Sequence, residues 1–84
     1  MTTYQVAASI RYLDGALAGL IIPSGVNLRY PTLSPARRAV AFFAKVRRDR
    51  DCIRATGTGH RYQIVGEVSL IRHERRHHEQ HKTL

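Results

Sequence analysis

One stretch, residues 32–48, constrains the fold more than any other, because it alone shows the full pattern of a helix. Ser34 is a good N-cap residue, and Pro35 suits the first helical position, where a missing N–H costs nothing. Alanine and arginine, both strong helix formers, fill most of the interior. The sequence therefore predicts one helix here, set between two runs of strand-like sequence.

At 100° per residue this helix has two different sides. The apolar side, which should pack on a sheet, holds Ala36, Ala39, Val40, Phe43 and Val46. The opposite side, which should meet solvent or a partner, holds Arg37, Arg38, Ala41, Lys45 and Arg48. Phe42 lies at the edge of the apolar side and is expected to be partly exposed.

Arg37 and Arg38 are expected in the first helical turn, where the helix dipole disfavours cations. An anion docked at the helix start would offset that cost, since free N–H groups and two guanidinium groups would converge on it. The other interpretation is that arginine is simply a good, solvated helix residue.

Strand-like sequence on both sides of the helix completes the predicted fold. The expected strands cover residues 4–13, 16–22, 26–30, 52–56 and 60–71. Asp14-Gly15 predicts a two-residue hairpin turn, Pro23-Ser24-Gly25 a second turn, and Gly66 a bulge or bend. The order is βββαββ, which gives an α+β fold: a small, mostly antiparallel sheet covered on one face by a single helix.

The first predicted hairpin has two consequences for packing. Ile10 would lie opposite Gly19, so Ala8 and Gly19 would leave a dent on the inner face that a ring such as Phe43 could fill. The outer face would be too apolar for a simple water-facing surface. It would either be covered or form a homodimer or partner interface through Leu13, Leu20 and Ile22.

Length and composition indicate one small domain over residues 1–72 and a charged, His/Arg-rich tail over residues 73–84. The tail has almost nothing apolar to bury and is expected to be flexible. The lone Cys52 permits no intramolecular disulfide and fits a small buried thiol in a reducing cytoplasm. No signal peptide is visible, and the apolar run 16–22 is too short to span a membrane, so a cytoplasmic protein without a membrane partner is expected.

The polar residues offer little for catalysis. Glu67 is the only carboxylate within a predicted strand, and it has no obvious carboxylate partner. A Cys52–His60 nucleophile pair is conceivable across the second hairpin, but a buried thiol is the favoured interpretation. We therefore expect neither enzymatic activity nor a cofactor.

Two further motifs have a plain structural explanation beside a binding one. Gly57-Thr58-Gly59 could form a phosphate-binding nest beside Arg61, but a hairpin turn explains both glycines. His73, His77 and His81 would line one face of a helix and could hold zinc or nickel, with His78 beside them. Nothing rigid orients these histidines, so no metal site is expected.

Charge is the best-supported functional feature. The formal net charge is +8, and residues 34–84 carry twelve basic and five acidic residues. Twelve of the fourteen basic residues are arginine, whose planar fork pairs bidentately with phosphate or carboxylate. The candidate residues for binding nucleic acid or an acidic partner are Arg37, Arg38, Lys45, Arg47, Arg48, Arg50, Arg54, Arg61, Arg72, Arg75 and Arg76.

The leading interpretation is a small, non-enzymatic binding protein that engages nucleic acid mainly through phosphates. Tyr30 and Tyr62 would stack on bases only if exposed, and inward packing is favoured. The alternative is a protein–protein interaction module that docks on an acidic or nucleoprotein surface. An example is a phage- or plasmid-encoded inhibitor of a host nuclease or CRISPR complex. The chain is similar to such inhibitors in its size and in its βββαββ order without recognisable motifs.

Overall fold

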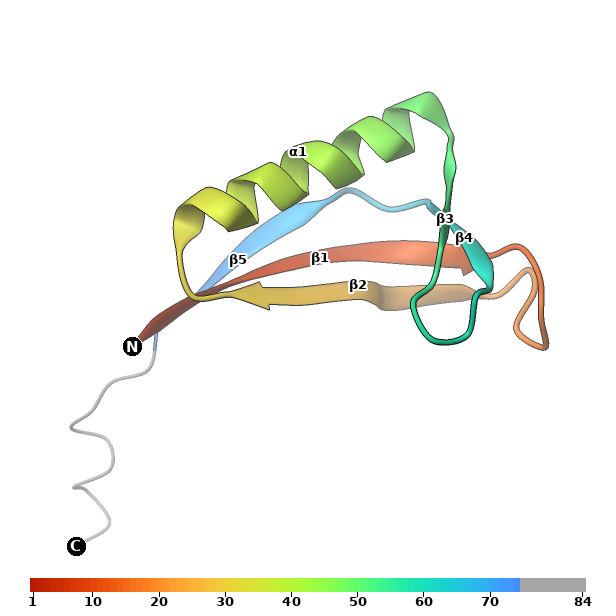
Figure 1. The fold of residues 1–84 in the computed structure, drawn as a ribbon, viewed down its shortest axis with the longest axis horizontal. Coiled ribbons are helices and arrows are strands. Elements are labelled where there is room, and N and C mark those ends of the chain that lie inside the picture. The colour runs from red at the N-terminus through yellow and green to blue at the C-terminus, as the bar shows by residue number, and fades with distance from the viewer. Residues whose placement is uncertain (75–84) are drawn as a thin grey trace, which may run out of the picture.

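A computed structural model describes residues 1–74, in which five strands form one sheet and one helix lies over one of its faces (Figure 1). The elements are β1 (Thr2–Tyr12), β2 (Ile21–Tyr30), α1 (Leu33–Asp49), β3 (Cys52–Arg54), β4 (Arg61–Ile64) and β5 (Ser69–Glu74). The predicted class, α+β with an antiparallel sheet and a single covering helix, is confirmed. The predicted order βββαββ is wrong, because two strands precede the helix and three follow it.

β1 is the centre of the sheet because it is paired along both of its edges. One edge pairs with β2. The other edge pairs with β5 along Thr2–Ala7 and with β4 along Ile10–Tyr12. β3 extends the sheet beyond β4, and every pairing is antiparallel.

β4 and β5 run along the same edge of β1 as one strand that is interrupted over residues 65–68. Val65 and Gly66 both donate their backbone N–H groups to the carbonyl oxygen of Ser9, at 3.0 and 3.2 Å. A Cβ on Gly66 would lie 2.9 Å from the Cβ of Ser9, so glycine allows the two chains to approach this closely. The predicted irregularity at Gly66 is confirmed.

The connection between β1 and β2 corrects the predicted hairpin. A loop over residues 13–20 replaces the two-residue turn, and Ile10 lies opposite Ile22 instead of Gly19. Long-range contacts hold this loop open: Leu13 donates its N–H to the carbonyl oxygen of Arg61 at 2.8 Å, and the Asp14 carboxylate accepts the N–H of Arg61 at 3.0 Å. Turn propensity alone contains no information about these contacts.

The changed register moves the glycine that matters for packing. Gly19 is exposed at a φ of 87°, and a Cβ there would meet nothing within 4 Å, so the predicted dent at Ala8 and Gly19 is wrong. Gly25 takes that role, because a Cβ at this position would overlap the side chain of the buried Ile10. The segment predicted as a turn at 23–25 belongs to β2, where the pairing register shifts between Ala8 and Ile10.

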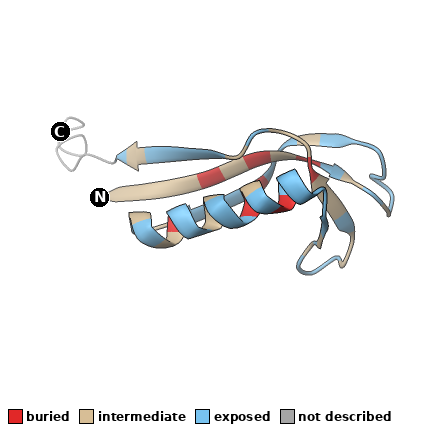
Figure 2. Ribbon diagram, turned by 90° about the horizontal axis from the view of Figure 1, so that it is seen from above, coloured by how far each residue is buried: buried red, intermediate tan, exposed pale blue. Residues whose placement is uncertain are grey.

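The core lies between α1 and the covered face of the sheet (Figure 2). Its buried side chains are Val6, Ala8, Ile10, Val26, Ala36, Phe43, Val46 and Ile64. Ala39 and Val40 pack against them, so the predicted apolar side of the helix is confirmed. Phe42 is 56% exposed, as expected.

The start of α1 differs from the prediction by two residues. Thr32, in extended conformation, is the N-cap, and its side chain makes no capping hydrogen bond. Ser34 and Pro35 therefore lie inside the first turn, where an N–H has no intrahelical acceptor and proline is tolerated. Arg37 and Arg38 come after that turn, so the predicted anion site at the helix start loses its geometric basis.

Three further expectations meet the structure here. Cys52 is exposed, so the prediction of a buried thiol is wrong. Within the described chain, α1 is the only helix, and no helix has the length and apolar character needed to cross a membrane. The tail beyond residue 74, with Arg75 and Arg76, lies outside the described residues.

Candidate nucleic-acid interface

The side of α1 that faces away from the sheet carries Arg37, Arg38, Lys45 and Arg48, which we call the helix basic face. All four residues are exposed, and the buried residues of α1 lie on the opposite side (Figure 2). From Arg37 to Arg48 the helix advances about 16 Å. Over that length a DNA duplex presents roughly nine phosphate charges, more than enough to engage the whole face.

Most cations of the helix basic face are unpaired. Within residues 1–74, none of the ion pairs includes Arg37, Arg38 or Arg48. Lys45 differs, because its Nζ lies 3.1 Å from Oδ2 of Asp49 one turn further along the helix. Both side chains are exposed, so this pair is weak and a phosphate could compete for the ammonium group.

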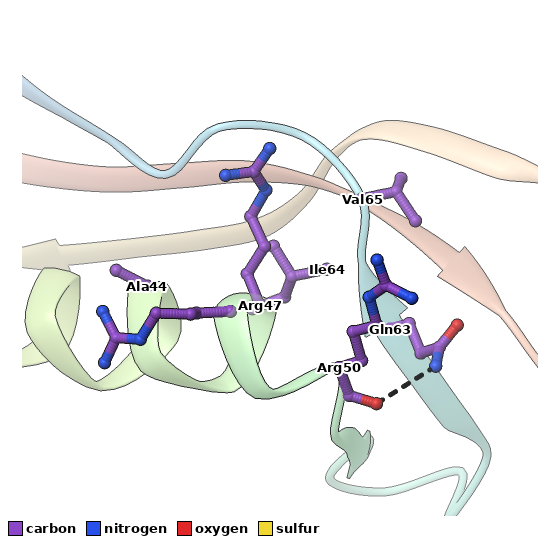
Figure 3. A pocket seen from close by; sticks show the side chains of 7 residues that line it. Ala44, Arg47, Arg50, Gln63, Ile64 and Val65 are labelled. Atoms are coloured by element: carbon purple, nitrogen blue, oxygen red, sulfur yellow. Dashed lines mark hydrogen bonds between the residues drawn. The ribbon is translucent and has the colours of Figure 1, made fainter.

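A second basic group lies where α1 ends. Arg50 adopts the left-handed conformation with a φ of 57° and caps the helix, donating its N–H to the carbonyl oxygen of Arg47 at 3.2 Å. Gln63 of β4 donates its Nε2 to the carbonyl oxygen of Arg50 at 3.4 Å, which brings the helix end against the sheet (Figure 3). Arg47 and Arg48 in the last turn also suit the negative end of the helix dipole.

An open hollow of about 630 Å³ lies between the end of α1 and the end of β4. Arg47, Arg48 and Arg50 provide its charged rim, and Gln63 is its uncharged polar residue. The remaining lining is apolar. It comes from Ala44 of α1, from Ile64 at the end of β4, and from Val65, the residue after β4 (Figure 3). This hollow was not predicted, because no pattern of residues indicates that the end of β4 lies beside the end of α1.

Three other predicted binding residues make contacts within the fold instead. Arg54 donates Nη1 to the carbonyl oxygen of Gly59 at 2.8 Å, and Arg61 donates Nε to Oδ2 of Asp14 at 3.2 Å. Arg72 donates Nη2 to Oε1 of Glu74 at 3.4 Å. Arg61 and Arg72 also lie beside opposite ends of β1, so the structure does not gather the predicted set into one surface.

The Asp14 carboxylate ties the loop over residues 13–20 to β4. It accepts the backbone N–H of Arg61 and the Arg61 guanidinium, and its Oδ1 lies 3.3 Å from Nδ1 of His60. Two hydrogen bonds from Arg61 lower the pKa of this carboxyl below its usual value. The bond from the backbone N–H has the larger effect, and the bond from the guanidinium group has the smaller one. The contacts of Asp14 therefore connect the loop to the sheet. His60 takes part in them because it lies just before Arg61, at the start of β4.

The Gly57-Thr58-Gly59 motif and Cys52 both belong to the hairpin formed by β3 and β4. Gly59 donates its N–H to the carbonyl oxygen of Ala55, and the N–H of His60 bonds to Oγ1 of Thr58. The N–H of Gly59 is therefore not available to a phosphate nest, and residues 56–58 form a turn between β3 and β4, which confirms the turn interpretation. Cys52 lies opposite Gln63 in the β3–β4 ladder, while the ring of His60 lies against Asp14 and Gly15.

Both tyrosines considered for base stacking pack inward. Tyr30 and Tyr62 are half-buried and contact the core. The rings of Tyr12 and Tyr62 meet edge to face with centroids 6.2 Å apart, and burial raises the pKa of the Tyr62 hydroxyl. Both rings therefore contribute to packing on the sheet, as the favoured interpretation predicted.

The predicted apolar interface is partly misplaced. Leu13 and Leu20 are exposed in the loop, but Ile22 packs against the core because it lies opposite Ile10 in the true register. Leu17 and Ile21 are exposed in its place, at 46% and 52%. We call Leu17 and Leu20 of the loop, together with Ile21 at the start of β2, the apolar loop.

Compared with protein-family models, curated proteins and solved structures, the chain matches none of them. Among residues 1–74, no three His, Cys, Asp or Glu side chains converge so as to hold a metal ion. His77, His78 and His81 lie outside the described residues.

Proposed function

We propose that the protein is a small, non-enzymatic binding protein that engages nucleic acid mainly through phosphate contacts. The observation that carries this proposal is the helix basic face. Arg37, Arg38 and Arg48 are exposed and have no ion-pair partner among the described residues, on a helix whose other side belongs to the core. The helix backbone spaces these guanidinium groups along about 16 Å, and a row of cations without ion-pair partners among the described residues suits an extended anion such as a phosphate backbone.

The expected binding mode is electrostatic. Each guanidinium group can donate two parallel hydrogen bonds to one phosphate, and neutralising phosphates releases counterions from the nucleic acid. No side chain of the helix basic face is held in place to read a base edge, so sequence preference should be weak. Affinity should therefore depend strongly on salt and little on sequence.

The test is a salt titration of the full chain with a random-sequence DNA duplex. Engagement of four phosphates predicts that log K falls against log salt with a slope of about −3 to −4. Replacing Arg37, Arg38, Lys45 and Arg48 together by Gln should flatten most of that slope. Because these side chains lie outside the core, circular dichroism should show an unchanged fold.

A matched pair of variants separates a located interface from a general effect of net charge. Arg37→Gln with Arg38→Gln removes two charges from the helix basic face, and Arg11→Gln with Arg29→Gln removes two from the uncovered face of the sheet. Arg11 and Arg29 alternate with the core residues of their strands and are exposed. The first pair should weaken binding much more than the second. Equal effects, or no binding of any nucleic acid by folded protein, would reject the proposal.

The second candidate function is a protein–protein interaction module, and the apolar loop favours it. Leu20 is 53% exposed, and the loop that contains it lies at one end of the molecule (Figure 1). The same loop contains Asp14, which pairs with Arg61. A partner protein with an acidic surface, or a second copy of the chain, would use such residues. Here Leu20→Asp should abolish association without unfolding the monomer, and unmodified protein should not shift nucleic acid at physiological salt.

A further inference from the structure

The hollow at the end of α1 has a different character from the helix basic face. The face is convex and follows the helix, whereas the hollow is a concave site built from two elements, α1 and β4 (Figure 3). Its volume of about 630 Å³ is enough for one nucleotide, and the hollow is open to solvent on one side. A duplex cannot enter a space of this size, but a single nucleotide can.

The charge balance around the hollow favours an anion. Arg47, Arg48 and Arg50 line it, and no ion pair among the described residues includes any of them. Asp49 is engaged by Lys45, while Asp51 follows Arg50 and is exposed. Three guanidinium groups against one unpaired carboxylate leave a net positive site. The negative helix end weakens this field only in part, because the N–H groups of Arg50 and Asp51 cap two of the last carbonyl oxygens.

The rest of the lining selects among anions. Ala44, Ile64 and Val65 offer an apolar surface beside the guanidinium groups, which inorganic phosphate alone would leave uncovered. Gln63 uses Nε2 in its bond to Arg50 and retains Oε1 as an acceptor for an amino group. A guanidinium plane can also stack on a base. Phosphate, planar ring and amino group occur together in nucleotides.

We infer that this hollow binds a nucleoside phosphomonoester, either as a free nucleotide or as the phosphorylated end of an oligonucleotide. The phosphate lies among Arg47, Arg48 and Arg50, and the nucleoside lies over Ala44, Ile64 and Val65. A phosphomonoester carries up to two negative charges, which three guanidinium groups suit better than the single charge of a backbone diester. This inference goes beyond backbone binding by the helix basic face. The two sites share Arg48, so the variants that test the hollow change only Arg47 and Arg50.

The experiment is a calorimetric titration of the full chain with adenosine 5′-monophosphate, with adenosine and with inorganic phosphate, each at an ionic strength of about 0.15 M, where charges outside the site are screened. The monophosphate should bind about tenfold more tightly than either fragment, since only it uses both the arginines and the apolar surface. Backbone amide signals of Ala44, Ile64 and Val65 should shift in the NMR spectrum. Inorganic phosphate binding as tightly as the monophosphate, or shifts confined to Arg37 and Arg38, would overturn the inference.

Two variants of equal charge provide the control. Arg47→Gln with Arg50→Gln should weaken monophosphate binding about tenfold or more. Arg37→Gln with Arg38→Gln should leave it within about twofold, because exposed charges outside the site are screened. Equal losses in the two variants would mean nonspecific attraction and would overturn the site. Because duplex is absent from this titration, its outcome is separate from that of the salt titration.

Two oligonucleotides distinguish the sources of the ligand. If the phosphorylated end of a strand is the ligand, a 5′-phosphorylated single strand should bind more tightly than its 5′-hydroxyl counterpart, and Arg47→Gln with Arg50→Gln should remove the difference. If a free nucleotide is the ligand, the two strands should bind alike while the monophosphate still binds. Both results support the hollow as a site, and absence of binding by the monophosphate and by the phosphorylated strand rejects it.

Discussion

The two sides of α1 use the same seventeen-residue helix for different purposes. On one side, Ala36, Phe43 and Val46 are buried against the sheet. On the other, Arg37 and Arg48 are exposed and unpaired within the described residues. A single helix thus separates folding from candidate binding, so substitutions on one side should change stability and substitutions on the other should change binding.

Neighbouring phenylalanines give the sharpest test of this comparison. Phe43 is 8% exposed and Phe42 is 56% exposed, although their rings touch edge to face with centroids 5.2 Å apart. Phe43→Ala should lower the free energy of unfolding by about 3–5 kcal/mol, the usual cost of emptying a core site. Phe42→Ala loses mainly the ring contact, about 1 kcal/mol. Urea denaturation measures both, and equal losses would mean that the helix is rotated.

The next effect concerns the sheet surface beneath the helix. A Cβ on Gly25 would overlap the buried side chain of Ile10, so Gly25→Ala should destabilise the protein by about 1–3 kcal/mol through overpacking. Adding Ile10→Ala should leave the double variant less destabilised than the sum of the two single variants, because it removes Cγ1 and Cδ1, the two atoms of Ile10 that lie nearest to the added Cβ. Thermal unfolding of the single and double variants checks this, and an additive double variant would contradict the contact.

The exposed side of α1 should behave in the opposite way. Arg37→Gln, Arg38→Gln and Arg48→Gln should each change the free energy of unfolding by less than about 0.5 kcal/mol, because each residue is exposed and lacks an ion-pair partner among the described residues. The same variants should weaken nucleic-acid binding. A large loss of stability in any of them would show that the arginine packs on the fold, and the separation between the two sides would fail.

The parts of the fold that were predicted correctly are those set by local periodicity. The strand pattern placed Ala8 on the inner face of β1, where it is buried, and the helical period identified both sides of α1. The irregularity at Gly66 was also predicted, because glycine within a strand pattern favours a bulge.

The errors come from contacts between distant residues. Asp14 and Arg61 are 47 positions apart, yet they contact each other at the loop over residues 13–20, which replaces the predicted two-residue turn and so changes the register of β2. Turn propensity at Asp14-Gly15 predicted a hairpin, and this placed Gly19 and Ile22 wrongly. The hollow was missed for the same reason, since Gln63 meets Arg50 only through the packing of β4 beside the end of α1.

The smallest predicted effect tests that long-range contact by pH. Hydrogen bonds from Arg61 hold the pKa of Asp14 below its usual value of 3.8, so the carboxylate contributes stability above that value. The contribution is lost as pH falls through the lower pKa of the folded state, because protonation then occurs in folded and unfolded chains alike. Asp14→Asn should therefore lower the melting temperature slightly at pH 7, and the difference from the unmodified protein should shrink below pH 4. The effect is small because the pair is exposed to solvent.

Asp51→Asn, which removes an exposed carboxylate without an ion pair among the described residues, is the control and should show no such pH-dependent difference. If both variants respond to pH alike, the contact between Asp14 and Arg61 does not hold the loop, and Asp14 affects the melting temperature only through the net charge of the protein.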